Sequence, residues 1–203
     1  MSVCPGRGSP AVSRGASAAV PVDEHVGRPV AFLHPHRLAA SVTEFDDALA
    51  DDVIVRRAER ADLLDVLRIE RACFSEPWPY SAFELFVDEP AFLVAARGTE
   101  ILGYVVADVM PNHGNDIGHV KDLAVRPEAR GNGLGRRLLL DALTAMTIAG
   151  AAVVKLEVRA SNEPARNLYQ SVGFRPARRV PRYYGDGEDA FIMVLDIHDW
   201  QSR

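Results

Sequence analysis

A glycine-rich turn lies between an apolar strand and a helix, and this arrangement restricts the fold of the chain more than any other feature. The apolar pattern predicts a strand over His119 to Val125, a helix over about Leu134 to Ala149 and a second strand over Val153 to Val158. A strand, a crossover helix and a second strand form a βαβ unit, in which the two strands run parallel. The sequence therefore predicts an α/β fold with a parallel strand pair near the middle of its sheet.

Predicted hairpins flank this unit on both sides and make the sheet mixed. Upstream, two strands join around Gly98, and downstream two final strands flank the turn Gly185-Asp186-Gly187. Asp62 is a candidate cap for a helix that runs to Cys73. The other expected elements are strands over 53–57, 92–96 and 101–109, a short helix that carries Phe83 and Phe86, and a helix over 164–172.

One folded domain is predicted after an N-terminal extension. Residues 1 to about 37 are rich in Gly, Pro, Ser, Ala and Arg and have no sustained apolar period, which is typical of disorder. From Leu38 to Leu49 apolar residues recur at helical spacing, which favours at most a marginal helix. We therefore expect residues 1–51 to be disordered or weakly ordered and residues 52–203 to form the folded domain.

The bulk composition narrows the class of protein. A formal net charge of -5 argues against a nucleic-acid-binding body, which usually needs a basic stripe. Cys4 and Cys73 lie far apart and lack the neighbours of a metal site, so we expect neither a disulfide framework nor a bound metal. No stretch reaches the roughly 18 apolar residues of a membrane span, and the N-terminus lacks the apolar core of a signal peptide. These features predict a cytoplasmic protein.

The glycine-rich turn, Arg130-Gly131-Asn132-Gly133-Leu134-Gly135, is a candidate anion site. Glycines let the backbone turn sharply and approach a ligand, and the first N–H groups of the following helix have no partner within the helix. With the helix dipole, these groups suit a pyrophosphate. Arg126, Arg136 and Arg137 add local positive charge. The alternative is that the glycines only shape a tight turn; the Walker and Rossmann patterns are absent.

Three side chains in or beside the βαβ unit are candidates for acid–base chemistry. Glu157 interrupts an apolar strand, and a buried carboxylate without a partner is costly. It therefore pairs with Lys121 or Lys155, or it faces a wet cleft, and the residues alone leave a structural ion pair and a functional base equally open. Tyr169 on a helix and His119 at a strand start are, by themselves, more typical of structural positions.

The turn and the segment before it resemble the acetyl-CoA motif of the GNAT superfamily. The resemblance rests on the Arg-x-x-Gly-x-Gly spelling from Arg130 to Gly135 and on the run from His119 to Pro127 before it. It implies a GNAT fold, in which the parallel strands splay apart and helices cover both faces of the mixed sheet. It also implies that the loop amides hold the pyrophosphate of coenzyme A, while backbone groups of Leu123, Ala124 and Val125 hold the pantetheine arm and thioester.

The run from Leu156 to Asn162, with the Leu-Tyr-x-x-x-Gly-Phe pattern after it, is similar to the RimI branch of the family, the ribosomal-protein N-terminal acetyltransferases. This resemblance implies that Glu157 is the proton acceptor and Tyr169 the proton donor, and that Asn162 contacts coenzyme A. In the archaeal N-terminal acetyltransferases a histidine at the place of His119 helps a glutamate to relay a proton through water. His119 is therefore a secondary candidate base.

Two further segments resemble the walls of a peptide site. The segment that begins Tyr183-Tyr184 is similar to the hairpin that closes over the peptide in N-terminal acetyltransferases, although an ordinary aromatic hairpin has the same pattern. The loop from Phe74 to Tyr80 would form the opposite wall. Within it Glu76 matches, by spacing only, a glutamate that contacts the first substrate residue in the archaeal enzymes, and it is equally well explained as a solvated loop charge.

The resemblance covers roughly residues 53 to 197 and makes residues 52–203 a GNAT N-acetyltransferase domain. It implies transfer of acetyl from acetyl-CoA to the α-amino group of proteins, ribosomal proteins among them. An α-amine, with a reference pKa of about 8, costs about 1.4 kcal/mol to deprotonate at pH 7, and a lysine about 4.6 kcal/mol, so a glutamate base suits the α-amine better. The alternatives are a GNAT enzyme that acts on a small-molecule amine or a lysine side chain, and a non-catalytic acetyl-CoA-binding module.

Overall fold

The computed structural model describes residues 52–202. The strands are β1 (Val53–Arg57), β2 (Leu93–Arg97), β3 (Glu100–Met110), β4 (Asp116–Val125), β5 (Ala151–Arg159), β6 (Arg175–Val180) and β7 (Ala190–Asp196). The helices are α1 (Leu63–Cys73), α2 (Tyr80–Glu84), α3 (Leu134–Ile148), α4 (Glu163–Val172) and α5 (Ile197–Gln201), with 3-10 turns η2 (Arg60–Asp62) and η3 (Pro127–Ala129). The disorder predicted for the N-terminal extension and the marginal helix over 38–49 lie outside the described residues.

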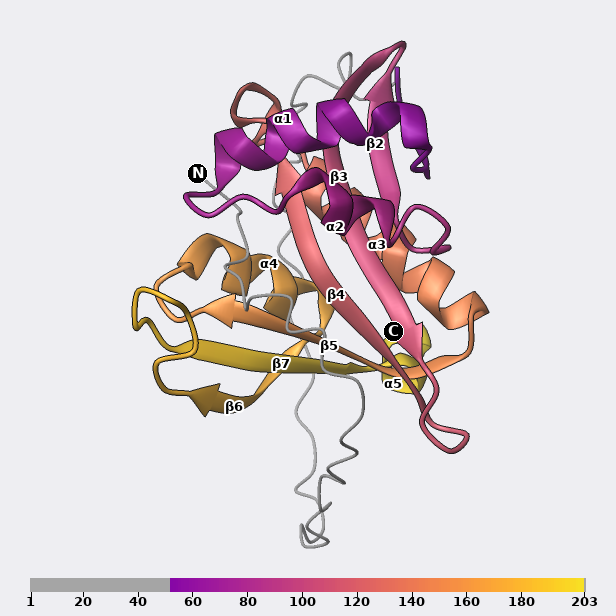
Figure 1. The fold of residues 1–203 in the computed structure, drawn as a ribbon. Coiled ribbons are helices and arrows are strands. Elements are labelled where there is room, and N and C mark those ends of the chain that lie inside the picture. The colour runs from indigo at the N-terminus through magenta and orange to yellow at the C-terminus, as the bar shows by residue number, and fades with distance from the viewer. Residues whose placement is uncertain (1–51, 203) are drawn as a thin grey trace, which may run out of the picture.

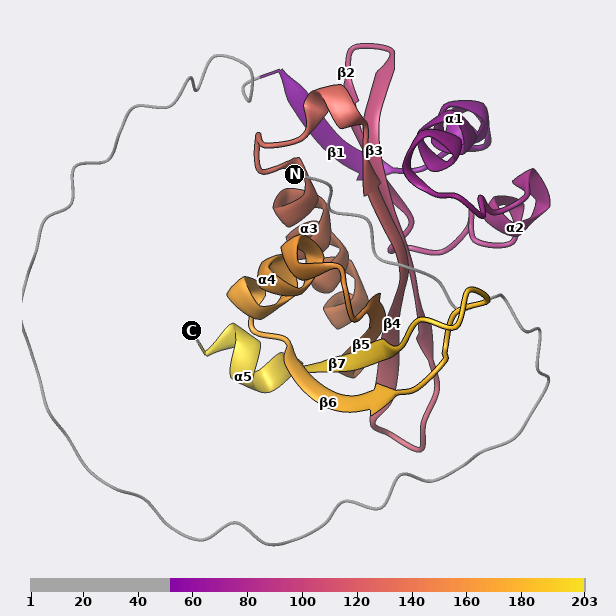
Figure 2. The same ribbon diagram turned by 90° about the vertical axis from the view of Figure 1, so that its left-hand side faces the viewer.

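The strands form a seven-stranded sheet in the order β1-β2-β3-β4-β5-β7-β6. Among the strands of residues 52–202, only β4 and β5 run parallel, and every other neighbouring pair is antiparallel. Helices α1 and α2 lie on one face of the sheet, while α3 and α4 lie on the other (Figures 1 and 2). The predicted α/β class, the mixed sheet and the helices on both faces are confirmed.

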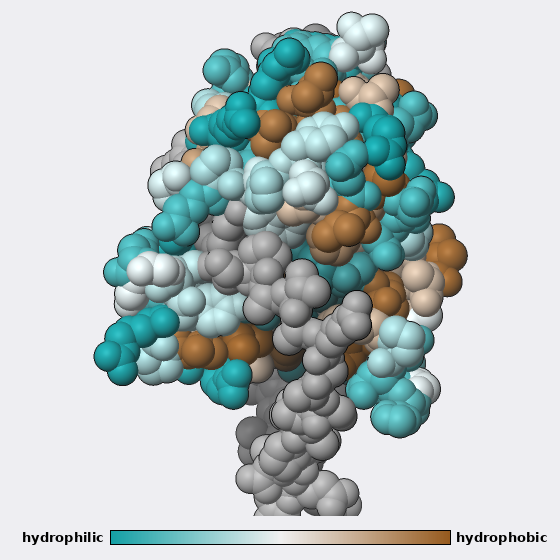
Figure 3. All heavy atoms as spheres, viewed as in Figure 1, coloured by the Kyte–Doolittle hydropathy of each residue, from teal (hydrophilic) through white to brown (hydrophobic). Residues whose placement is uncertain are grey.

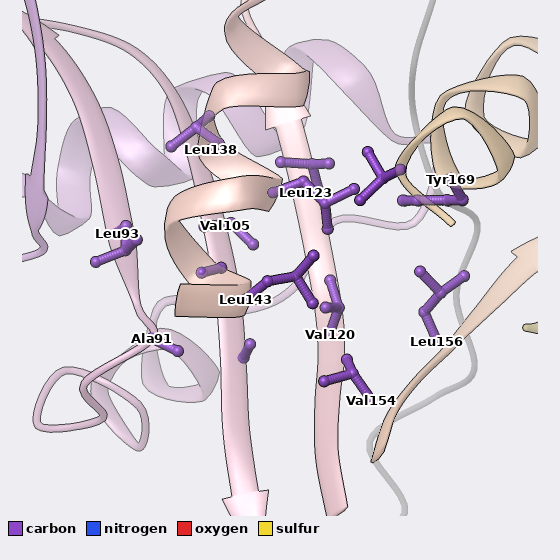
Figure 4. Packing of buried hydrophobic residues seen from close by; sticks show 14 of the residues in the cluster. Ala91, Leu93, Val105, Val120, Leu123, Leu138, Leu143, Val154, Leu156 and Tyr169 are labelled. Atoms are coloured by element: carbon purple, nitrogen blue, oxygen red, sulfur yellow. The ribbon is translucent and has the colours of Figure 1, made fainter. Parts of the chain in front are cut away.

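Two apolar cores lie on the two faces of the sheet. The larger packs α3 and α4 against the strands, and Figure 4 shows Leu138 and Leu143 of α3 in this cluster with Val105 of β3 and Leu123 of β4. The smaller packs α1 and α2 against the sheet, around an edge-to-face contact between the rings of Phe83 on α2 and Tyr104 on β3. Each fully buried apolar side chain contributes about 1.5–3 kcal/mol relative to exposure, so both faces of the central strands are held firmly.

The parallel strands β4 and β5 separate part-way along their length. They pair from Asp116 opposite Ala151 to Val120 opposite Leu156, and no strand pairing between them continues beyond that point within residues 52–202. Strand β4 stays paired with β3, and β5 stays paired with β7. The splayed parallel pair that the resemblance implied is confirmed.

A β-bulge marks the point at which β4 leaves β5. Val106 of β3 pairs with Asp122, whereas Ala107 pairs with Val120, so Lys121 is the extra residue. A bulge breaks the alternation of faces and increases the local twist. As a result Val120 and Leu123 both point into the larger core, although they are three residues apart.

The N-terminus of α1 differs in one detail from the expectation. Asp62 occupies the N-cap position of α1, but its side chain makes no capping bond to that helix. It accepts the N–H of Glu59 at 2.8 Å and two N–H groups of Arg56 at 2.7 and 2.8 Å. Asp62 therefore closes the preceding 3-10 turn and fastens it to β1, rather than capping α1.

One face of the domain is mainly polar. Figure 3 shows a largely hydrophilic face, with apolar residues in small separate groups. Within the part of the chain that is described, no helix combines the length and the apolar character that crossing a membrane requires.

Candidate active site

The glycine-rich turn forms an open concave surface at the start of α3. Gly131 and Gly133 have φ values of 87° and 75°, in the left-handed region that glycine adopts without strain. A Cβ atom at either position would meet no other atom within 4 Å, so the backbone faces open space. A pocket of about 170 Å³ lies here, lined by Val125, Ala129, Arg130, Gly131, Gly133, Leu134, Gly135, Arg136 and Leu168. The first N–H groups of a helix have no partner within the helix, so the N-terminus of α3 beside this pocket suits an anion.

The arginines near this turn have different positions. Arg136 lines the pocket. Arg130 donates from Nε to the carbonyl of Val125 at 3.0 Å and from a terminal nitrogen to Cys73 Sγ at 3.0 Å, which fixes the turn to the end of β4. Arg137 instead donates to the carbonyl of Val53 at 2.7 Å, and Arg126 forms an ion pair with Glu100 at 3.1 Å. Arg137 and Arg126 therefore connect structural elements. Their guanidinium groups are already engaged in these contacts and are less available to an anion in the pocket.

The segment Leu123–Val125 lies where β4 has parted from β5. Its residues pair with β3, and on the other side the last strand pair is Val120 with Leu156. An extended ligand can use backbone groups along such an open strand edge in the way that an added strand does.

Glu157 points to the same face of the sheet as α1 and α2, beside the separation of β4 and β5. Its Oε2 lies 2.6 Å from His119 Nε2, and its Oε1 lies 3.6 Å from Lys155 Nζ. Its side chain keeps 13% of its exposure, so the carboxylate is paired and also reached by solvent. Burial by itself raises the pKa of Glu157, but the hydrogen bond with His119 and nearby positive charges, those of Lys155 and Lys121 included, outweigh it and lower the pKa below its usual value. The carboxylate is therefore ionised at neutral pH.

Tyr169 lies on the opposite side of the same separation. It is buried on α4, its ring meets that of Phe174 edge to face at 5.8 Å, and Figure 4 shows its side chain pointing toward Leu123. Asn162 is the N-cap residue of α4, where its side-chain oxygen accepts the N–H of Ala165 at 3.2 Å. Asn162 thus has a structural role, and its side-chain NH₂ group is the part left for a ligand.

The tyrosine pair of the β6–β7 loop lies close to Glu157. The rings of Tyr183 and Tyr184 meet edge to face at 5.1 Å. Burial raises the pKa of Tyr183, and the negative charge of Glu157 raises it further, which places the Tyr183 hydroxyl in the field of that carboxylate. Burial also raises the pKa of Tyr184, so both tyrosines are neutral hydrogen-bonding groups at physiological pH.

The loop before α2 reaches the β6–β7 loop that carries Tyr183 and Tyr184, the tyrosine hairpin. A Cβ atom built on Gly185 would lie 3.7 Å from Glu76 Oε1, so the Glu76 carboxylate sits beside the hairpin turn. The two predicted walls of a peptide site are therefore adjacent, although they are more than 100 residues apart in the chain. Tyr80, predicted to belong to this wall, is the first residue of α2 and packs against the smaller core.

Two parts of this site have no counterpart among the predicted site residues. Arg159 fastens the tyrosine hairpin by ion pairs of 2.7 Å to both Asp186 and Glu188. Lys121 and Asp108 form an ion pair of 3.0 Å on the side of His119 that faces away from Glu157. The sequence offered Lys121 and Lys155, the two lysines of the chain, as partners of Glu157; Lys155 pairs with it at 3.6 Å, whereas Lys121 lies 3.3 Å from His119 Nδ1.

This geometry agrees with comparisons to known proteins. A family model described as "Acetyltransferase (GNAT) family" matches residues 63–174, which is more than half of the chain. The chain belongs to the GNAT acetyltransferase family. As a GNAT acetyltransferase it is an acyltransferase, and acetyl-CoA is the coenzyme that this family binds.

Relatives of this GNAT acetyltransferase include N-terminal acetyltransferases. It is 36% identical over 154 residues to an N-alpha-acetyltransferase of Sulfurisphaera tokodaii, covering 70% of this chain and 92% of the relative. It is 30% identical to the ribosomal-protein-S18-alanine N-acetyltransferase of Escherichia coli, whose crystal structure gives a TM-score of 0.64 and covers 71% of this chain and 94% of that one. A chain of the NatC complex bound to Gag peptide and CoA has the same fold, with 23% identity, a TM-score of 0.67, and coverage of 71% and 98%.

Proposed function

We propose that this chain transfers acetyl from acetyl-CoA to the α-amino group of proteins, through a domain that spans residues 52–203. The observation that carries the proposal is the Glu157–His119 pair of 2.6 Å, which lies beside the splayed strands. On this arrangement an ionised base stands next to the gap in which a thioester and an amine can meet. The N-alpha-acetyltransferase of Sulfurisphaera tokodaii, 36% identical, supports the same activity.

The residues at the start of α3 fit the coenzyme. The turn Arg130-Gly131-Asn132-Gly133-Leu134-Gly135 and Arg136 would hold the pyrophosphate, since positive-φ glycines and free helix N–H groups line an open pocket there. Leu123, Ala124 and Val125 would hold the pantetheine arm, with the NH₂ group of Asn162 as a further contact. Acetyl-CoA supplies the activated acetyl group as a thioester.

Glu157 is the proposed general base. It would accept a proton from the α-amine, directly or through water and His119, because only the neutral amine attacks a carbonyl carbon. As the C–N bond forms and the C–S bond breaks, the Tyr169 hydroxyl would protonate the departing thiolate, whose reference pKa is about 8.5. The position of Tyr169, directed from α4 toward Leu123, supports this role.

The acceptor site is proposed to lie between the loop that carries Glu76 and the tyrosine hairpin. Tyr183 is a partly exposed, neutral donor and acceptor that can hold a peptide backbone, and Glu76 stands beside the same turn. Tyr184 is buried, meets Tyr183 edge to face and would support its position in the peptide site. Tyr80 would act only indirectly, by supporting the loop from the smaller core. Because the structural relative from Escherichia coli acts on ribosomal protein S18, an N-terminus of a ribosomal protein is a candidate acceptor.

A peptide-library assay tests this proposal. The purified full chain is incubated with acetyl-CoA and short peptides of varied N-terminal sequence, and products are identified by mass. We expect acetylation at the α-amine of some peptides and none on matched peptides whose α-amine is blocked but which carry a lysine. Turnover of a small amine or a lysine side chain, without any reaction at free N-termini, would replace the proposal with the corresponding alternative. Coenzyme binding without any turnover would indicate a non-catalytic binding module.

A further inference from the structure

Both lysines of the chain lie at the Glu157–His119 pair, but they occupy different positions. Lys155 Nζ lies 3.6 Å from Glu157 Oε1. Lys121 Nζ lies 3.3 Å from His119 Nδ1 and does not form an ion pair with Glu157 in the structure. Lys121 lies two residues after His119 and points to the same face of the sheet, and it is also the bulge residue of β4. The two lysines therefore contact opposite ends of the pair.

The position of Lys121 is built by three contacts. Its ammonium forms an ion pair with Asp108 Oδ2 at 3.0 Å, approaches His119 Nδ1 at 3.3 Å, and lies 5.5 Å from the centre of the Phe86 ring. The side chains of Lys121 and Asp108 keep only 19% and 17% of their exposure. An ion pair so far removed from solvent is screened less than a surface pair, so it can hold one geometry.

The chemistry of an ammonium group decides the roles of the two His119 nitrogens. An ammonium has three donors and no acceptor, so in its contact with Lys121 the Nδ1 atom of His119 must accept. A neutral imidazole that accepts at Nδ1 carries its proton at Nε2. That nitrogen lies 2.6 Å from Glu157 Oε2 and donates to it. The donors thus point in one direction, from Lys121 to His119 and from His119 to Glu157.

We propose that Lys121, held by Asp108, is a positioning residue that keeps His119 in its neutral Nε2–H form, so that Glu157 rather than His119 is the base. A second proton on His119 would lie at Nδ1, directly against the Lys121 ammonium. A neutral His119 orients the Glu157 carboxylate with one hydrogen bond to Oε2, so that Oε1, which lies 3.6 Å from Lys155 Nζ, is the oxygen that would take the proton of the amine. This inference rests on the proposed function only for the identity of the amine.

Charged and titratable groups face this pair from every strand and loop that packs against it. Lys121 opposes a positive charge on His119, whereas Glu157 and Asp108 favour one. The groups are Asp108 on β3, His119 and Lys121 on β4, Lys155 and Glu157 on β5, and Tyr183 and Tyr184 in the β6–β7 loop. Asp108 is paired with Lys121, and Glu157 accepts from Nε2–H whether or not Nδ1 is protonated, so the contact of Lys121 with Nδ1 is the one that distinguishes the neutral from the doubly protonated form of His119.

The test is a comparison of Lys121→Met, Lys121→Arg and Lys155→Met in the full-length chain. The ¹⁵N chemical shifts of the His119 side chain report its tautomer in the free protein and do not depend on turnover. We expect Nε2–H in the unmodified chain and in Lys121→Arg, whereas Lys121→Met should populate the Nδ1–H or doubly protonated form. Lys155→Met is the matched control, because it also removes an ammonium near Glu157 but should leave the His119 tautomer unchanged.

Kinetics on an accepted peptide complete the test. Lys121→Met should lower kcat/KM about tenfold and move the acidic limb of its pH profile up by about one unit, and Lys121→Arg should restore most of both. The KM for acetyl-CoA should stay constant. An Nδ1–H tautomer in the unmodified chain, or an unchanged tautomer and pH profile in Lys121→Met, would overturn the inference. If the tautomer behaves as expected but no N-terminus is acetylated, the proposed function fails and the positioning role stands.

Discussion

The guanidinium carbon of Arg159 lies 4.1 Å from the centre of the Tyr184 ring. The same side chain forms ion pairs of 2.7 Å with Asp186 and with Glu188, so it contacts both the Tyr184 ring and the turn of the tyrosine hairpin. Arg159 is two residues beyond Glu157 on β5, and alternate residues of a strand share one face. The strand that presents the candidate base therefore also sets the position of the candidate peptide site.

Replacing Arg159 should weaken peptide binding more than it slows the chemical step. Arg159→Ala removes the stacking contact and both ion pairs, so the hairpin loses its attachment to β5. We expect the KM for peptide to rise about tenfold, which corresponds to about 1.4 kcal/mol, with a smaller change in kcat and a constant KM for acetyl-CoA. Steady-state kinetics with each substrate varied in turn gives the three values.

Arg159→Lys is the companion variant. It keeps the charge but not the planar group that stacks on Tyr184 and contacts both carboxylates, so an intermediate KM for peptide is expected. An equal loss of affinity for peptide and acetyl-CoA would instead mean that Arg159 supports the whole fold.

Glu157→Gln tests the base directly. The amide has nearly the same shape and can still accept the N–H of His119, but it cannot take up a proton. A general base typically contributes about 10²–10⁴-fold, and we expect kcat to fall within that range. Calorimetric titration with coenzyme A should give a dissociation constant close to that of the unmodified chain. Turnover that survives the substitution would remove Glu157 from the proposed mechanism.

Tyr169→Phe tests the proposed acid. The ring and its edge-to-face contact with Phe174 remain, so the unfolding midpoint should shift little. Loss of the hydroxyl should lower kcat by about 10²-fold or more, because the leaving thiolate then lacks its proton donor. A normal rate, together with a normal unfolding midpoint, would leave Tyr169 as a core residue only.

The sequence predicted the central part of the fold because its signals are local. The apolar period, the glycine turn and the following helix lie within one continuous segment, and β4, α3 and β5 appear there in the predicted order. The boundaries differ by a few residues, since β4 begins at Asp116 rather than His119. Such differences arise because the ends of strands are fixed by pairing with β3 and β5, which the local pattern does not contain.

The neighbours of Glu157 could not be predicted in the same way. Strict alternation along β4 would put His119 on the face of Leu123, inside the larger core. The bulge at Lys121 reverses the faces and brings His119 to the Glu157 side, and nothing in the residue pattern marks it. The meeting of Glu76 with Gly185 likewise depends on the packing of two distant loops.

The glycine turn gives a prediction about conformational strain. Gly133 has a φ of 75°, a left-handed conformation that costs other residues about 1–2 kcal/mol. Gly133→Ala should therefore lower the free energy of unfolding by about that amount and weaken acetyl-CoA binding. Gly135 lies within α3, and an added Cβ would make only ordinary contacts of 3.7 and 3.8 Å. Gly135→Ala should leave stability unchanged or raise it by about 0.5–1 kcal/mol. Equal stability of the two variants in urea denaturation would show that the left-handed turn is not required.

Asp62 should make the free energy of unfolding depend on pH under acidic conditions. Its hydrogen bonds with Arg56 lower its pKa, burial opposes this, and the N–H of Glu59 lowers it further. A carboxyl whose folded pKa is below its unfolded value stabilises the fold above the unfolded value, near 3.8, and loses that contribution as pH falls through the folded pKa. Asp62→Asn should lower the free energy of unfolding by about 2 kcal/mol at neutral pH, because charge-assisted hydrogen bonds are lost.

The decisive quantity is the difference in unfolding free energy between the unmodified chain and Asp62→Asn, measured by urea denaturation over a series of pH values. The difference should be constant near neutrality and shrink below pH 3.8, since both chains then carry an uncharged side chain at this position. Asp65→Asn is the control, because Asp65 forms a more exposed pair with Arg68 within one helix, worth about 0.5 kcal/mol or less. A difference for Asp62→Asn that stays constant down to the lowest pH would mean that shape, and not charge, makes Asp62 stabilising.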